Sequence, residues 1–441
     1  MSRRETVFKA FMEQREFVDA RVKHSTELYR KGDAAITFVS DGELPEDITV
    51  EIEQVNHQLK FGANLFMLDE LESDEKNWIY REKFPEIFNI ATLPFYWNTL
   101  EPERGKPRFS KDSPKVYRRP PIDLCMEYCA EKGIEPKLHC LNYDLFTPDW
   151  LIGASNMEVK RALAKRFREI GERYSNLIPM VEVTNETYCP PHKTDFFFAD
   201  DYVEWSFREA QKHFPANELI INESYLQWDV VNASTSHNPY YQQIEKLLRG
   251  NVPVHGIGMQ FHSFFPREME AEHTIKRGRY NPEHLFATMD KFEQLNLPLQ
   301  ITEMTIPAYS DDAEDEEIQA ELIERLYRIF FAQRNMEAII YWNVIDGYAH
   351  GTKPGDMTGG ENKYHGALLR FDMSEKPAYK VLKKLIKDEW HTSLTKKAEN
   401  GRLTFRGYHG DYKLTVHAGG KVIPVDYRLR RGMNNKIEVV I

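Results

Sequence analysis

Eight short apolar segments alternate with eight helix-like segments along the middle of this 441-residue chain. Strands that alternate with helices form parallel sheets, because a crossover helix is needed to return the chain to the same edge. Eight such units are the count of a (β/α)₈ barrel, so we predict an α/β fold of the TIM-barrel type. A doubly wound sheet is the alternative, but no Gly-rich nucleotide loop follows the first strand. The apolar runs lie near 61–66, 87–95, 134–141, 180–185, 217–222, 254–260, 297–302 and 337–344, and the helical patterns lie at 74–85, 121–132, 156–174, 197–213, 236–249, 281–294, 314–334 and 376–388.

The flanking segments depart from this pattern and predict a small accessory β-domain. Within residues 1–60, a helical pattern at 5–31 is followed by strand-like runs at 35–39 and 48–52. Residues 391–441 form short strand-like runs between Gly- and Asn-rich turns. About fifty residues of isolated β-structure would bury too little surface to be stable alone. We therefore expect residues 391–441 to pack with residues 35–57, beside a catalytic barrel of residues 61–390.

The charge of the chain disfavours several kinds of partner. A net charge of −11 is unsuited to nucleic acid or an anionic membrane, because both attract positive surfaces. A neutral polysaccharide or oligosaccharide is compatible with it. No apolar run follows the basic residues at the N-terminus, and no segment has the length and hydrophobicity of a membrane span. We expect a cytoplasmic location, or secretion if a signal peptide has been removed, and the sequence leaves the oligomeric state open.

The sequence predicts neither a metal nor a cofactor. No histidine stands at metal-ligand spacing from the four cysteines, which we interpret as reduced core residues. A metal-dependent barrel hydrolase would carry His-x-His on its first strand, where this chain has FGANLF. The acidic run at 311–317 is more typical of the solvated first turn of a helix than of a cation site. The cysteines are Cys125, Cys129, Cys140 and Cys189.

Two of the apolar runs end on a glutamate. Glu186 ends the fourth run, VEVTNE, and Glu303 ends the seventh, LPLQITE. The carboxyl ends of barrel strands face the active site, so two carboxylates distant in sequence can converge on one substrate. Two carboxyl groups that face one bond are the minimum set of catalytic groups for cleaving a glycoside. The Gly-rich segment 351–366 follows the eighth strand on the same side and is either a flap over the substrate or a mobile loop.

The two glutamates and their neighbours resemble glycoside hydrolase family 10, whose best known members are endo-β-1,4-xylanases. The resemblance covers about residues 61–388, and its strength lies in the joint order and spacing of motifs that are each weak. The matching segments are WNTLEPERG at 97–105, LHCL at 138–141, TPDWL at 147–151, NE at 185–186, NESY at 222–225, GIGMQFH at 256–262, ITE at 301–303, YWN at 341–343, LLRFD at 368–372 and KPAY at 376–379.

The resemblance implies a role for each residue near the pair. Glu186 would be the general acid and Glu303 the nucleophile of a retaining mechanism, in which Glu186 later acts as base on water. Asn185 would hydrogen-bond the sugar 2-hydroxyl, and His262 would hold Glu303 in orientation. Gln260 lies two residues before His262 on one strand and therefore faces the same side.

A second set of residues is expected to contact the sugar. Trp342 would stack on a sugar ring or pack in the barrel, and we weigh both interpretations equally. The predicted substrate-binding residues are His139, Tyr96, Tyr143, Asp144, Trp342 and Trp97.

Several positions depart from the family's pattern. Xylanases carry polar residues that bind the non-reducing-side sugars at three positions near the end of the second strand, and they carry Trp and His after the G-H-T-L motif. The aspartate that follows the family's nucleophile is also replaced, so the partner of His262 changes. We therefore expect the sugar hydroxyls to be recognised differently, which weakens the assignment of xylan as the substrate. The departing residues are Thr92, Leu93, Tyr96, Tyr143, Asp144 and Thr305.

The leading hypothesis is a retaining glycoside hydrolase that cleaves β-1,4-linked xylan or a related plant β-glycan by double displacement. One alternative is a family 10-like β-glycosidase with a different or exo specificity. Another is a non-catalytic carbohydrate-binding barrel. The presence of both Glu186 and Glu303 argues against that last hypothesis, because binding alone needs no paired carboxylates.

Overall fold

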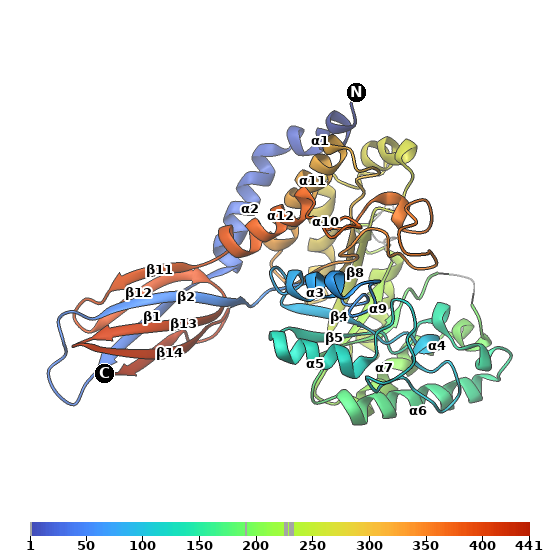
Figure 1. The fold of residues 1–441 in the computed structure, drawn as a ribbon, viewed down its shortest axis with the longest axis horizontal. Helices are drawn as coiled ribbons and strands as arrows, with labels where there is room; N and C mark the ends of the chain where they lie inside the picture. The colour runs from blue at the N-terminus through green and yellow to red at the C-terminus, as the bar shows by residue number, and fades with distance from the viewer. Residues whose placement is uncertain (1, 190–191, 225–227, 229–232) are drawn as a thin grey trace.

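The protein is built around a closed barrel of eight parallel strands (Figure 1). The computed structural model describes residues 2–189, 192–224, 228 and 233–441. Neighbouring barrel strands follow each other in chain order, and the eighth closes on the first through the pair Ile339 and Phe61. The predicted (β/α)₈ architecture is confirmed. The strands are β3 (Lys60–Asn64), β4 (Ile90–Pro94), β5 (Glu135–His139), β6 (Met180–Asn185), β7 (Glu218–Glu223), β8 (Gly256–His262), β9 (Leu299–Thr305) and β10 (Met336–Tyr341).

Helices surround the barrel, and local sequence signals define their ends. Ser155 caps α6 in a reciprocal capping box with Glu158, and Asn238 caps α9, which begins with a proline. Apolar residues at helical spacing on α6 are buried in the main hydrophobic core, so this helix turns its polar face outward. The helices are α3 (Asp74–Lys83), α4 (Trp97–Leu100), α5 (Ile122–Lys132), α6 (Asn156–Tyr174), α7 (Tyr202–His213), α9 (Pro239–Arg249), α10 (Pro282–Glu293), α11 (Ala313–Ala332) and α12 (Pro377–Lys384).

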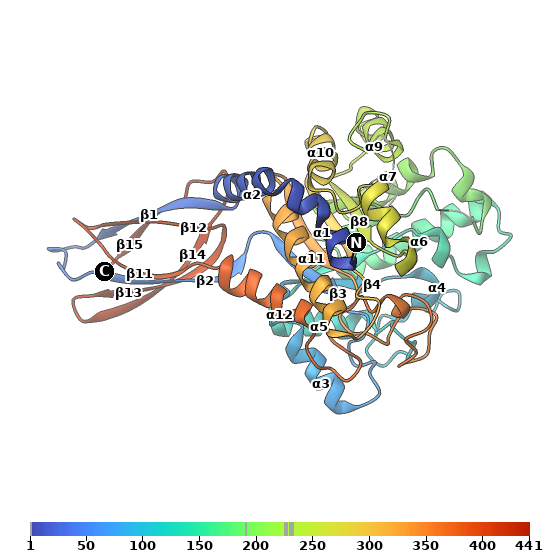
Figure 2. The same cartoon turned by 90° about the horizontal axis from the view of Figure 1, so that it is seen from above.

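Segments from both ends of the chain form two further sheets, which extend to one side of the barrel (Figures 1 and 2). One sheet has the order β12-β1-β15 and the other β11-β2-β13-β14, so each contains one N-terminal strand among C-terminal ones. They enclose a core of their own. The predicted accessory β-domain is confirmed, although two of its strands, β11 and β14, were not foreseen. The strands are β1 (Lys31–Val39), β2 (Thr49–His57), β11 (Ser393–Lys397), β12 (Arg402–Tyr408), β13 (Gly410–Ala418), β14 (Lys421–Leu429) and β15 (Lys436–Val440).

The accessory sheets lie at the end of the barrel opposite the expected catalytic rim. β2 leads into β3 through only Gln58 and Leu59, so the sheets join the barrel at the amino end of a strand. Arg30 strengthens the junction by donating to the carbonyl oxygen of Met336 at 3.1 Å, at the start of β10. The carboxyl ends of the strands are therefore left free for function.

The N-terminal helical pattern forms two helices rather than one. α1 (Arg3–Glu13) and α2 (Arg15–Tyr29) are separated at Gln14, whose φ of −107° and ψ of 17° interrupt the helix. No helix within the described ranges is long and apolar enough to cross a membrane. The four cysteines are free thiols; three are buried, as expected, and Cys189 is partly exposed.

The acidic run at 311–317 is only partly the solvated helix start that the sequence suggested. It does begin a helix, α11, but Asp315 and Glu316 are 3% and 2% exposed. Asp315 pairs with Arg3 at 2.9 Å, and Glu316 accepts from Arg370 Nε at 2.8 Å. The prediction of a solvated turn was wrong for these two residues, because their cationic partners come from distant parts of the chain.

Candidate active site

The two strand-terminal glutamates meet at the carboxyl rim of the barrel in different backbone settings. Glu186 lies one residue beyond β6 with a φ of +51°, a left-handed conformation that is uncommon outside glycine. Its backbone N–H donates to the carbonyl of Asn222 at 3.2 Å, which fixes the turn. Glu303 lies inside β9 and is 4% exposed, whereas Glu186 is half-buried. The pair therefore combines one accessible and one enclosed carboxylate.

One amide nitrogen links the two carboxylates. Gln260 Nε2 lies 3.0 Å from Glu186 Oε1 and 3.0 Å from Glu303 Oε1. The two oxygens therefore lie within about 6 Å of each other, whereas inverting glycosidases separate their carboxyl groups by roughly 6.5–9.5 Å. Gln260 thus fixes the spacing that decides which reaction such a pair can perform.

Glu303 is surrounded by hydrogen-bond donors. Asn222 Nδ2 donates to its Oε1 at 3.0 Å, and His262 Nε2 lies 3.1 Å from its Oε2. Burial raises the pKa of Glu303 well above its usual value; the nearby His139 opposes this effect and the charge of Glu186 adds to it. The donors favour the ionised form, so the carboxylate is enclosed but prepared to carry a negative charge.

His262 is neutral in this site. Burial lowers the pKa of His262 to about 4. Its Nδ1 lies 2.9 Å from Thr305 Oγ1, which can donate its hydroxyl proton, so Nε2–H is left to donate to Glu303. A hydroxyl at position 305 in place of a carboxylate is consistent with an uncharged imidazole. Thr305 thereby sets the tautomer that orients Glu303.

The amide of Asn185 is fixed by its neighbours. Asn222 Nδ2 donates to Asn185 Oδ1 at 2.7 Å, and Thr302 Oγ1 donates to Asn222 Oδ1 at 2.6 Å. The amide oxygen of Asn185 is engaged, so Nδ2 is the atom that can donate to a substrate. Asn185 is only 4% exposed, and its position beside both carboxylates suits a contact with the reacting sugar.

A chain of buried charges runs beneath the pair. Lys137 and His139 both pair with Glu182, and all three side chains are at most 1% exposed. Burial alone would raise the pKa of Glu182, but the two cations lower it to about 2. Burial likewise opposes the charged form of His139, yet Glu182 raises the pKa of this imidazole. His139 Nε2 lies 4.0 Å from Glu303 Oε1, so positive charge is held close to the buried carboxylate.

Three predicted substrate-binding residues lie around this centre. Tyr143 donates its hydroxyl to Glu186 Oε2 at 2.5 Å, and the Tyr96 hydroxyl lies 2.9 Å from His139 Nε2. The Trp342 ring is 5.5 Å from the ring of His139 and 5.8 Å from that of His262, the two imidazoles that flank Glu303. Aromatic side chains therefore surround the catalytic carboxylates, as a sugar site requires.

The model of glycosyl hydrolase family 10 matches residues 72–385. The chain belongs to glycosyl hydrolase family 10. Among curated relatives, endo-1,4-beta-xylanase 2 of Arabidopsis thaliana is 22% identical over 89% of this chain, and endo-1,4-beta-xylanase B of Thermotoga neapolitana is 24% identical over 78%. The match covers 93% of the Thermotoga protein but only 33% of the plant one, so the chain spans about a third of that relative's length.

Solved structures agree on the fold. Xylanase 10B from Thermotoga petrophila, determined in complex with xylobiose, matches with a TM-score of 0.59 at 22% identity. The match covers 75% of this chain and 95% of that structure. The uncovered quarter of this family 10 chain is about the size of its N- and C-terminal segments.

Two of the predicted sugar contacts have other partners in this family 10 barrel. Trp97 Nε1 donates to Glu101 at 2.9 Å, and its ring packs edge-on against Trp150. Asp144 lies 2.7 Å from His192 Nδ1, on the loop after β6. The structure gives Trp97 and Asp144 supporting contacts in the surrounding loops, and their sugar-binding roles stay predictions.

Asn222, Glu182 and Glu223 were not assigned roles from the sequence. Glu223 is 1% exposed and accepts from the backbone N–H of Thr187 at 2.8 Å, directly after the catalytic acid candidate. Burial raises the pKa of Glu223 to about 7. A signal did exist, because Glu182 interrupts the apolar run of β6, and Asn222 and Glu223 end that of β7. Buried polar groups in a strand need partners, and these strands supply them to each other.

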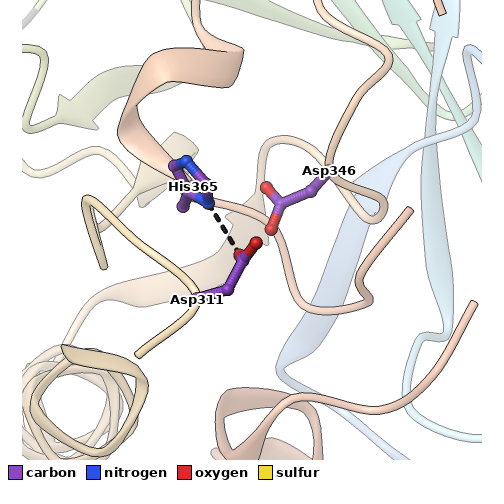
Figure 3. A group of neighbouring side chains, drawn as sticks. All are labelled: Asp311, Asp346 and His365. Atoms are coloured by element: carbon purple, nitrogen blue, oxygen red, sulfur yellow. Dashed lines mark hydrogen bonds and ion pairs between the residues drawn. The ribbon is translucent and has the colours of Figure 1, made fainter. Parts of the chain in front are cut away.

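A separate cluster of two aspartates and a histidine has the side chains of a metal site. Asp311, Asp346 and His365 bring ligand-type atoms close together, and Asp311 Oδ1 lies 2.7 Å from His365 Nδ1 (Figure 3). Asp346, however, pairs with the fully buried Lys376 at 3.0 Å, and the Lys376 ammonium also donates to the carbonyl of His365. Because an ammonium group already neutralises Asp346, the cluster is explained as a structural ion pair.

Proposed function

We propose that this family 10 protein is a retaining glycoside hydrolase that cleaves β-1,4-linked xylan or a related plant β-glycan by double displacement. The observation that carries the proposal is the shared contact of Gln260 with Glu186 and Glu303. It holds the two nearest carboxylate oxygens within about 6 Å of each other. A bridge through one nitrogen favours the short carboxyl separation of a retaining pair, about 5–5.5 Å, over the wider one that an inverting pair needs for its water.

The reaction proceeds in two displacements at the anomeric carbon. Glu303 attacks this carbon, the bond to the glycosidic oxygen breaks, and Glu186 gives its proton to the departing oxygen. In the second step Glu186 takes a proton from water, whose oxygen attacks the same carbon and releases Glu303. Two inversions restore the original configuration. Asn185 supports both steps by donating to the 2-hydroxyl as positive charge develops on the sugar.

The protonation of the free pair fits this sequence of steps. Burial favours the protonated form of Glu303 in the free pair. Attack requires the proton on Glu186 instead. Three donors, from Asn222, His262 and Gln260, stabilise the Glu303 anion when the proton moves. One transfer therefore produces the acid and the nucleophile together.

The substrate class is supported by the relatives and by the charge of the chain. The curated matches include endo-1,4-beta-xylanases, and one matching structure contains xylobiose. A net charge of −11 suits a neutral glycan better than an acidic polymer. Polysaccharide or oligosaccharide is thus the proposed partner.

A substrate panel with three variants tests the proposal. Wild type, Glu186→Ala, Glu303→Ala and the surface control Glu43→Ala would be assayed on xylan, arabinoxylan, glucuronoxylan, mixed-linkage glucan and aryl β-glycosides. We expect wild type and Glu43→Ala to hydrolyse the polysaccharide substrate and both catalytic variants to lose this activity, with the β-anomer as the first product in an NMR time course. An α-anomer as first product would contradict retention. Full activity in either catalytic variant would contradict the site.

A further inference from the structure

We propose that the site accepts only the non-reducing end of a β-glycan chain and releases single sugars from it. The inference rests on the proposed function and defines its substrate more narrowly. Its basis is a continuous row of aromatic side chains that closes one side of the barrel mouth. We call this row the aromatic wall, and it consists of Trp342, Phe66, Tyr96, Phe146 and Tyr143.

Neighbouring rings of the aromatic wall touch along its whole length. The ring centroids of Trp342 and Phe66 are 5.3 Å apart, and those of Phe66 and Tyr96 are 5.7 Å apart. Tyr96 and Phe146 follow at 4.1 Å, and Phe146 and Tyr143 at 5.3 Å. The rings come from the loops after β10, β3, β4 and β5, which are adjacent in the barrel. The wall therefore extends across the loops of four adjacent strands.

Four of the five rings of the wall offer almost no surface to a second sugar, and the fifth, Tyr143, is half-buried. Phe66 is 1% exposed, Tyr96 and Trp342 are each 5% exposed, and Phe146 is 8% exposed. A sugar that stacks on an aromatic ring needs one open face of that ring. The wall is therefore a barrier at the end of the site and not a platform along which a chain continues.

A buried arginine packs against three rings of the wall. The guanidinium carbon of Arg119 lies 4.2 Å from the ring centre of Tyr96, 5.2 Å from that of Phe66 and 5.6 Å from that of Phe146. Arg119 is 4% exposed, and its Nη1 donates to the carbonyl of Arg118 at 2.8 Å. Arg118 in turn donates to Asn343 Oδ1 at 3.1 Å, on the loop after β10. The wall is therefore held from two loops.

The Gly-rich loop after β10 is also fixed against the wall. His350 packs edge-on against Phe146 with ring centres 5.6 Å apart. Asn362 ties the loop together, because its side chain accepts from the backbone N–H of Gly347 at 3.1 Å and of Ala349 at 3.0 Å. These hydrogen bonds and the His350 contact make the loop a part of the barrier.

Most of the wall lies on the side of Glu303, where the sugar stays on the enzyme, and its last ring, Tyr143, reaches Glu186. Trp342 packs beside His139 and His262, whose imidazoles flank Glu303. The Tyr96 hydroxyl is hydrogen-bonded to His139. The sugar attached to the nucleophile is the non-reducing-side residue, because its anomeric carbon carries the bond that breaks. Glu186, which meets the leaving group, is half-buried, and Tyr188 beyond it is 40% exposed. This arrangement favours one sugar on the closed side, with the rest of the chain leaving past Glu186.

A comparison of two substrate lengths tests the inference on the wild-type protein. We expect kcat/KM for 4-nitrophenyl β-xyloside to exceed that for 4-nitrophenyl β-xylobioside by about tenfold or more, because the second sugar would meet the wall. The same order is expected for the glucoside and the cellobioside if glucan is the substrate. From xylotetraose labelled at its reducing end, xylose and labelled xylotriose should appear first.

The outcomes separate this inference from the proposed function. Faster hydrolysis of the bioside, or xylobiose as the first product, would overturn the end-on site while leaving a retaining hydrolase in place. If the protein hydrolyses neither these substrates nor any member of the polysaccharide panel, the proposed function is overturned, and the inference with it.

A variant of the wall provides a second test. Phe146→Ala should raise kcat/KM for the bioside relative to the monoside by about tenfold, because it removes a ring that packs against both Tyr96 and Tyr143. Phe198→Ala removes a ring that is 67% exposed and lies outside the wall, so it should keep the wild-type ratio. Circular dichroism and thermal melting would verify that both variants fold. An unchanged ratio in a folded Phe146→Ala variant would contradict the role of the wall.

Discussion

The ends of β6 and β9 carry the same side chain in opposite settings. Glu186 lies beyond its strand in a left-handed conformation and is half-buried, whereas Glu303 lies within its strand and is 4% exposed. Glu303 is also enclosed by Asn222 and His262. The contrast shows that the local environment gives different roles to two chemically identical side chains. The accessible carboxyl can meet the leaving oxygen and water, and the enclosed one can hold the sugar.

The largest effect is expected at the enclosed end. Glu303→Ala should lower kcat by roughly 10⁴-fold or more on every substrate, because no other group can form the covalent intermediate. Added azide should restore turnover of an activated aryl glycoside and give a product of inverted configuration, which NMR would identify. Rescue with retained configuration would show that Glu303 is not the nucleophile.

At the accessible end the loss should depend on the leaving group. Glu186→Ala should reduce hydrolysis of xylan or its oligomers by roughly 10²–10⁴-fold, the usual contribution of general acid catalysis. Dinitrophenyl glycosides leave without protonation, so their first step should be nearly unaffected. Pre-steady-state kinetics on a series of aryl glycosides would measure this. An equal loss for good and poor leaving groups would remove the distinction between the two glutamates.

The pH dependence should reveal the coupling between the two ends. Glu303 must be ionised to attack, and its pKa is raised by burial and by the charge of Glu186. The acid limb of kcat/KM should therefore lie above the usual pKa of a glutamate. Glu186→Gln removes the neighbouring charge, so the acid limb measured with a dinitrophenyl glycoside should move to lower pH. A shift to higher pH, or none, would contradict this coupling.

The smallest effect is expected at Thr305, the hydrogen-bond partner of His262. Thr305→Val keeps the shape of the side chain but removes the hydroxyl that lies 2.9 Å from His262 Nδ1. We expect kcat to fall by about tenfold, the cost of one lost buried hydrogen bond, with KM little changed. Thr305→Ser keeps the hydroxyl and should remain close to wild type. Equal losses in both variants would assign the effect to packing instead.

The sequence predicted the barrel and the convergence of Glu186 and Glu303 because both depend on local signals. Strand and helix periods are visible in short windows, and Glu186 and Glu303 end apolar runs of the sequence. The partners of the pair were harder to predict. Asn222 reaches Glu303 only because β7 lies between β6 and β8 in the barrel, and the burial of Asp315 depends on Arg3, more than three hundred residues away. The aromatic wall likewise depends on loops from four strands.

The central claim is that Glu303 becomes covalently bonded to the sugar, and a trapping experiment tests it most directly. An aryl 2-deoxy-2-fluoro-β-xyloside should inactivate the wild-type enzyme, because the fluorine slows the second displacement more than the first. Mass spectrometry of the digested protein should then find one fluorosugar, attached to Glu303. A label on Glu186 would reverse the assignment of the two glutamates. Inactivation without a covalent adduct would contradict the double-displacement account. A first product of inverted configuration would contradict it as well.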